Sequence, residues 1–118
     1  MGNSIIEAKS FDFAIRIVKL YQYLCEEKKE FVLSKQLLRS GTSIGANVSE
    51  GERGQTKPDF NTKMSIALKE ANETGYWLEL LYKTNYITEA EYKTLDTACT
   101  SIRVMLISSI NTAKENSK

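Results

Sequence analysis

Apolar residues recur every three or four positions along almost the whole chain, which is the spacing of an amphipathic α-helix. The pattern falls into four segments and predicts helices over about residues 10–27, 32–53, 57–84 and 88–114. Short connections between such helices favour an all-α fold, an antiparallel up-down-up-down four-helix bundle. The 118 residues are enough for one domain of this size and too few for two, so we expect 1–118 to form a single domain.

Polar residues just before the apolar rows mark where the predicted helices begin. Ser10 can cap the first helix, which would leave residues 1–9 frayed. Thr56 can cap the third helix, and Thr88 together with Glu91 forms a capping box for the fourth. The first helix then has two adjacent apolar rows that we expect to face the core. These rows are Phe13, Ile17, Leu20 and Leu24, and Ala14, Val18, Tyr21 and Cys25.

The second predicted helix is unusually rich in small residues. A glycine inside a helix costs up to about 1 kcal/mol relative to alanine, so we expect another helix to pack closely against this surface. The small residues are Ser40, Gly41, Gly45, Ala46, Ser49 and Gly51. Just beyond the helix, Gly54 is expected near the left-handed conformation that often ends a helix. At the end of the chain, residues 114–118 are expected to fray.

The stretch Gly41-Thr42-Ser43-Ile44-Gly45 fits the G-x-S-x-G pattern of a hydrolase nucleophile elbow. That arrangement needs a histidine base and a strand before the serine. The chain has no histidine, and its pattern shows no alternation of strands with helices. On a helix, Ser43 shares one flank with Arg39, Asn47 and Glu50. We therefore interpret Ser43 as part of a polar seam.

A second set of polar side chains lies on the third predicted helix, where Glu70, Glu73 and Trp77 share a flank with Ile66 and Leu80. Buried polar groups on facing helices can form a network that fixes helix register. We favour this interpretation over a ligand site, which remains the alternative. The members would be Arg39, Asn47, Glu50, Glu70 and Glu73. Trp77 is expected to anchor the core or an interface rather than to stack on a base.

Glutamates on facing helices also resemble the ligands of di-iron bundles. Those sites add Glu-x-x-His motifs, and the chain has no histidine. Cys25 and Cys99 are far apart in sequence and lack the companions of a zinc site, so we expect both to be reduced and half-buried. We expect no metal, no cofactor, no catalytic residue and no small-molecule substrate, and we interpret the protein as a non-enzyme.

The formal net charge is +1, from 16 basic and 15 acidic residues, so the chain lacks the bulk positive field of many nucleic-acid-binding proteins. A local basic patch could still contact a phosphate backbone, and a ring of subunits would repeat it. The candidate residues are Lys35, Arg39, Arg53, Lys57 and Lys63. The alternative is a solvated face balanced by nearby acids. A membrane span and an export signal are both missing from the pattern, which predicts a cytoplasmic protein.

Two predicted helices carry more apolar surface than one bundle needs. On the third helix the surplus is Ile66 and Leu80, and on the fourth it is Val104 and Ile107, which point away from the main apolar stripe. Exposed apolar area of this kind is usually buried against a partner. The sequence therefore predicts a homo-oligomer.

Two stretches of the chain resemble a known family. The stretches are Arg39-Ser40-Gly41-Thr42-Ser43-Ile44-Gly45-Ala46-Asn47-Val48-Ser49-Glu50-Gly51 and Lys69-Glu70-Ala71-Asn72-Glu73-Thr74-Gly75-Tyr76-Trp77-Leu78-Glu79-Leu80-Leu81. From about Phe11 to Ile110, the sequence is similar to the bacterial four-helix bundle family of 23S rRNA intervening-sequence (S23-type) proteins. This family is related to the accessory variability determinant of diversity-generating retroelements, a barrel-shaped homopentamer that binds nucleic acid and a reverse transcriptase.

The resemblance implies a ring-shaped homo-oligomer, with five copies, that acts as a non-enzymatic binding or scaffold protein. It implies RNA, DNA or a reverse transcriptase as the partner. The near-neutral charge of this chain departs from the markedly basic surface of the retroelement protein. A structural or protein–protein interaction bundle without a nucleic-acid role is therefore the alternative.

Overall fold

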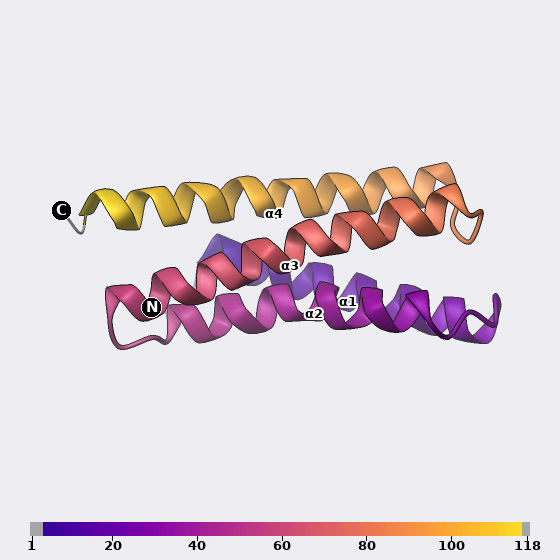
Figure 1. Ribbon diagram of the computed structural model, residues 1–118, viewed down its shortest axis with the longest axis horizontal. Helices are drawn as coiled ribbons and strands as arrows, with labels where there is room; N and C mark the ends of the chain where they lie inside the picture. The colour runs from indigo at the N-terminus through magenta and orange to yellow at the C-terminus, as the bar shows by residue number, and fades with distance from the viewer. Residues whose placement is uncertain (1–3, 117–118) are drawn as a thin grey trace.

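Four long α-helices make up the computed structural model, which describes residues 4–116. They are α1 (Ile5–Glu26), α2 (Leu33–Glu52), α3 (Lys57–Lys83) and α4 (Glu89–Asn116). Consecutive helices run in opposite directions, so α1 begins at the same end of the bundle where α4 finishes (Figure 1). Residues 4–116 contain no strand. The predicted all-α four-helix bundle is confirmed.

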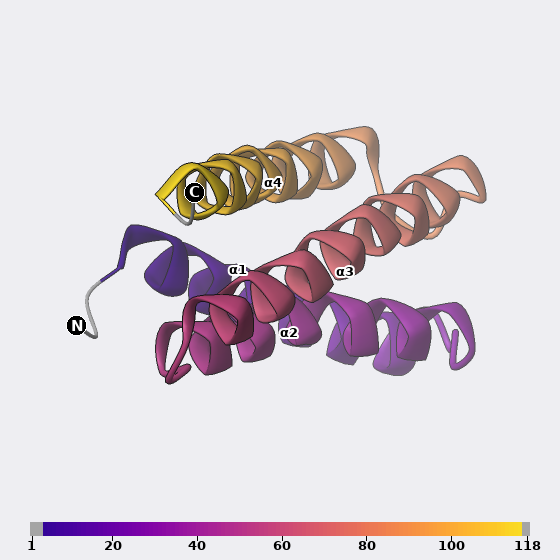
Figure 2. The same ribbon diagram turned by 60° about the vertical axis from the view of Figure 1, so that its left-hand side comes forward.

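The helices pack around the bundle in chain order. α2 packs on α1, α3 packs on α2 and α4 packs on α3, while the contact that joins α4 back to α1 is much the smallest. Figure 2 shows α1 and α4 at neighbouring corners, with the ribbons of α2 and α3 crossing closely. The molecule is a rod 49 Å long and about 20 Å across, with extents of 49 × 21 × 19 Å.

The first helix begins earlier than the sequence predicts. Ser4 caps it, since the Ser4 hydroxyl accepts a hydrogen bond from the Glu7 N–H at 2.9 Å. The prediction that Ser10 is the cap is wrong, because Ser10 is fully buried in the helix and its hydroxyl donates to the Glu7 carbonyl. Fraying is therefore wrong for residues 4–9, and residues 1–3 lie outside the described part of the chain. At the other end α4 continues through Asn116, so the predicted fraying is wrong for residues 114–116. Residues 117–118 lie outside the described part of the chain.

The other helix starts use different caps. Glu30 caps α2: its carboxylate accepts hydrogen bonds from the N–H groups of Val32, Leu33 and Ser34 at 3.2, 3.0 and 2.7 Å. Burial alone would raise the pKa of Glu30, but these hydrogen bonds outweigh it and hold the pKa below its ordinary value. Nothing in the sequence pattern pointed to this buried carboxylate.

The caps predicted for the two later helices are present. The Thr56 hydroxyl accepts from the Asp59 N–H at 3.2 Å at the start of α3. At the start of α4, the Thr88 hydroxyl accepts from the Glu91 N–H at 3.1 Å and the Glu91 carboxylate accepts from the Thr88 N–H at 2.8 Å. The capping box is therefore confirmed.

The sharp turns do not use glycine for left-handed backbone. Positive φ angles occur at Lys29 (54°) and Asn85 (70°), and at no glycine within residues 4–116. The left-handed conformation predicted for Gly54 is therefore wrong. Glycine fits there because a Cβ would lie 3.2 Å from the Cβ of Asp59, and the Gly54 N–H donates to the Gly51 carbonyl at 3.0 Å.

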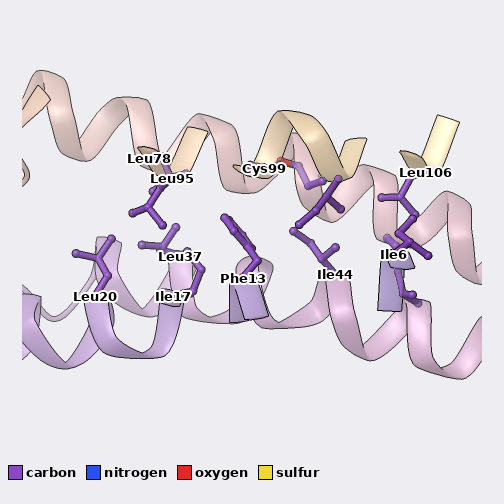
Figure 3. Packing of buried hydrophobic residues seen from close by; sticks show 14 of the residues in the cluster. Ile6, Phe13, Ile17, Leu20, Leu37, Ile44, Leu78, Leu95, Cys99 and Leu106 are labelled. Carbon is purple, nitrogen blue, oxygen red and sulfur yellow. Dashed lines mark hydrogen bonds between the residues drawn. The ribbon is translucent and has the colours of Figure 1, made fainter. Parts of the chain in front are cut away.

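The core is a continuous row of apolar side chains from all four helices, shown from close by in Figure 3. The first apolar row predicted for α1 is buried, whereas Val18 in the second row is exposed. Cys99 is fully buried rather than half-buried, and burial raises the pKa of its thiol to about 11. Both cysteines are free thiols.

Glycines let α1 approach α2 closely, as the small residues of the second helix predict. A Cβ on Gly41 would lie 2.8 Å from Cγ2 of Ile17, and one on Gly45 would lie 3.2 Å from the carbonyl oxygen of Ser10. Carbon atoms normally come no closer than about 3.5 Å. The close contact between α1 and α2 therefore depends on the missing side chains.

Candidate functional site

Arg39 links α2 to α3 through two glutamates. One guanidinium nitrogen donates to Glu70 at 3.2 Å and the other donates to Glu73. Glu73 also accepts from the indole N–H of Trp77 at 3.2 Å. The hydrogen bond from Trp77 and the bond from Arg39 hold the pKa of Glu73 below its ordinary value, against the effect of burial. This cluster of four side chains sets the register between the two helices.

The other residues of the sequence signature do not join this cluster. The Ser43 hydroxyl donates to the Arg39 carbonyl at 2.6 Å, and the Asn47 amide donates to the Ser43 carbonyl at 2.8 Å. Both bonds stay within α2. Glu50 forms an ion pair with Lys63 at 2.8 Å. The polar seam therefore divides into a cluster around Arg39, two bonds inside the helix and a separate ion pair.

The five basic residues singled out in the sequence do not form one patch. Lys35 and Arg53 are about 27 Å apart along α2, at 1.5 Å per residue. Arg53 pairs with Glu7 of α1 at 2.9 Å, and its hydrogen bond lowers the pKa of Glu7. Arg39 and Lys63 also have acidic partners. Lys35 and Lys57 are exposed at opposite ends of the bundle.

An uncharged row runs along the outside of α1. Its members are spaced three and four residues apart and all are exposed: Ala8, Phe11, Ile15, Val18 and Gln22, the outer α1 row. Phe11 has 65% of its surface exposed. The apolar pattern of the sequence assigned Val18 to the core and did not single out Phe11 or Ile15. The spacing of three and four was the signal that could have found this row.

A matching row runs along the outside of α4. Its members have the same spacing and all are exposed: Thr97, Thr100, Val104, Ile107 and Asn111, the outer α4 row. Val104 is 61% exposed. From residue 97 to residue 113 the only charged side chain is Arg103, which turns toward α3 and donates to Asn72 at 3.4 Å. The surplus predicted for Val104 and Ile107 is therefore exposed.

The apolar surplus predicted for α3 is covered in part: Leu80 is half-buried, whereas Ile66 is exposed. Trp77 and Leu80 are half-buried, and the indole of Trp77 packs edge-on against Tyr76, with 5.0 Å between the ring centroids. Ile66 is 37% exposed.

Across residues 4–116, acidic, cysteine and histidine side chains nowhere form a group of three that could hold a metal ion. Within the same range, every helix is too short or too polar to cross a membrane.

Comparison with known proteins places the chain in a family. None of the curated proteins matches it. One solved structure, a protein of unknown function from the S23 ribosomal protein family of Bacteroides thetaiotaomicron VPI-5482, is 57% identical with a TM-score of 0.89. The match covers 90% of this chain and 98% of that one. The sequence model for the 23S rRNA-intervening sequence protein matches residues 3–108. The chain therefore belongs to the 23S rRNA-intervening sequence protein family.

Proposed function

We propose that this protein is a non-enzymatic scaffold that assembles into a ring-shaped homo-oligomer of five copies and binds RNA. The observation that carries the proposal is the pair of outer rows on α1 and α4, which leave Phe11, Ile15, Val104 and Ile107 exposed in the single chain. Exposed apolar side chains gathered in this way are normally covered by a partner. The number five comes from the resemblance to the retroelement accessory protein.

The polar groups of the site support a structural rather than a catalytic role. The Ser43 hydroxyl is bonded to its own helix, and Glu70 and Glu73 accept from Arg39. Glu70 and Glu73 join α3 to α2 through Arg39, while Ser43 is bonded within its own helix and has no histidine base to activate it.

RNA is the proposed partner because the family description refers to intervening sequences of 23S rRNA. In a ring, each exposed lysine of one chain recurs in every subunit, so a few cations can follow a phosphate backbone. Lys35 and Lys57 are exposed in each copy.

The self-association is tested by the absolute mass of nuclease-treated protein, measured by light scattering at high salt. A mass of five times 13.4 kDa supports the ring, whereas the mass of one chain refutes it. High salt and nuclease treatment keep bound nucleic acid from bridging subunits.

RNA binding is tested by measuring affinity for 23S rRNA fragments between about 50 and 200 mM salt, where contacts to several phosphates weaken binding steeply. Lys35→Glu combined with Lys57→Glu should weaken binding. The control is Lys28→Glu combined with Lys83→Glu, which changes the net charge by the same amount. Equal effects of the two pairs would show that binding follows net charge alone and does not use these lysines.

A protein-interaction bundle without an RNA role is the second candidate. It is favoured by the ion pairs of Arg39, Arg53 and Lys63, which neutralise most of the candidate basic residues. This candidate predicts no retention of RNA at moderate salt, and a tight salt-sensitive RNA complex would exclude it.

A further inference from the structure

We infer that the contact between subunits joins the outer α1 row of one copy to the outer α4 row of the next. The inference rests on the proposed self-association and assigns the surfaces that carry it. The partner is a second copy of this chain. The contact is head to tail, because each copy uses its outer α1 row on one neighbour and its outer α4 row on the other.

The outer α1 row has the spacing of a coiled-coil seam. Its five positions follow one another at intervals of three, four, three and four residues, so they lie in one line on the helix. The row is opposite the buried side chains of α1 and contains no charge. The charged residues nearest to the row, such as Asp12 and Lys19, lie on its flank and can stay in contact with water.

The outer α4 row repeats this pattern with smaller side chains. Its intervals are also three, four, three and four residues, and its threonines and Asn111 surround Val104 and Ile107. The flanking positions Ser101 and Ser108 are exposed and uncharged. Solvent-facing helix surfaces usually carry charges, and depletion of charge marks the centre of an interface. The α4 row therefore offers the apolar side chains of Val104 and Ile107 to Phe11 and Ile15 of the α1 row.

A head-to-tail contact covers both rows in every subunit. A two-fold contact of α1 with α1, or of α4 with α4, would leave the other row exposed. α1 and α4 occupy neighbouring corners of the bundle (Figure 2), and the two rows lie on different helices, so each copy offers two separate surfaces to its neighbours. A head-to-tail contact of this kind repeats from copy to copy and is the contact that a closed ring of identical subunits requires.

The test uses one charge in each row. Phe11→Asp and Val104→Asp change side chains that are 65% and 61% exposed, so both variants should fold, which circular dichroism checks. Each variant alone should fall from the mass of the native oligomer to that of one chain. Tyr76→Asp is the matched control, since Tyr76 is 60% exposed on α3, outside both rows, and this variant should keep the native mass.

Mixing the two variants separates a contact of α1 with α4 from a contact of α1 with α1 or of α4 with α4, and the mass of the native protein separates a ring from a two-fold dimer. The intact α4 row of Phe11→Asp should bind the intact α1 row of Val104→Asp and give a complex of two chains that grows no further. The inference is overturned if either variant alone keeps the native mass, or if the two variants do not combine. Native protein with the mass of one chain would instead refute the proposed function itself.

Discussion

Replacing Gly41 by alanine should destabilise the protein, although alanine is the better helix former. The new Cβ would lie 2.8 Å from Cγ2 and 2.9 Å from Cγ1 of Ile17. Ordinary carbon contacts are about 3.5–4.0 Å long, so the overlap is about 0.7 Å or more. Ile17 is fully buried and branched at Cβ, so it has little freedom to move away.

The size of the effect follows from two opposing contributions. Overpacking a core costs about 1–3 kcal/mol, and replacing glycine by alanine in a helix recovers up to about 1 kcal/mol. We expect Gly41→Ala to lower the free energy of unfolding by about 1 kcal/mol. At Gly75 the nearest atom to an added Cβ is a guanidinium nitrogen of Arg103 at 3.9 Å, an ordinary contact. Gly75→Ala should therefore stabilise by about 0.5–1 kcal/mol.

Thermal and urea unfolding at a fixed protein concentration measure both variants. For a domain of this size, about 1 kcal/mol changes Tm by about 4 °C, so the two variants should differ by about 6–8 °C. Adding Ile17→Ala to Gly41→Ala should remove the overlap, and the double variant should be less destabilised than the sum of the singles. If Gly41→Ala stabilises as much as Gly75→Ala, the dependence of the α1–α2 contact on the missing side chain is wrong.

Three further measurements test other parts of the structure. Glu30→Gln should lower the free energy of unfolding at pH 7 by about 1 kcal/mol. The pKa of Glu30 is lower in the folded protein than its ordinary value of 4.5, so the carboxylate stabilises the folded state above pH 4.5. The difference in stability between native protein and variant should therefore vanish as pH falls through the folded pKa. An unchanged difference down to pH 2 in urea titrations would contradict this role. The fluorescence of Trp77, the only tryptophan, should titrate with a midpoint below 4.5 in folded protein, and Glu73→Gln should abolish that transition. Iodoacetamide should label Cys25 and spare Cys99 until the protein unfolds, and mass spectrometry of the native protein showing two labels would disprove the burial of Cys99.

The four-helix fold could be predicted because helical periodicity depends on local spacing. The row through Phe13, Ile17 and Leu20 is buried as its spacing requires. The start of α1 was missed because Ser10 is a polar residue at a buried position of the same row, and it resembles a cap. Ile6 continues the row on the other side of Ser10, but a serine between two apolar residues hides that continuity.

The features missed in the site depend on tertiary contacts. Glu30 belongs to a charged run, and only the turn at Lys29 brings its carboxylate to the first N–H groups of α2. The partners of Arg39 required knowledge of how α2 lies on α3, since Glu70 and Glu73 are more than 30 residues away. The outer α1 row was visible as spacing, but spacing alone does not say which side of a helix faces the core.

The small contact between α1 and α4 determines how the bundle opens. α2 and α3 share the largest interface, so they form a central pair to which the outer helices are attached from either side. Separating α4 from α1 disrupts few contacts, and local opening is least costly where few contacts are lost. Amide hydrogens along α2 and α3 should therefore exchange with solvent more slowly than those of α1 and α4.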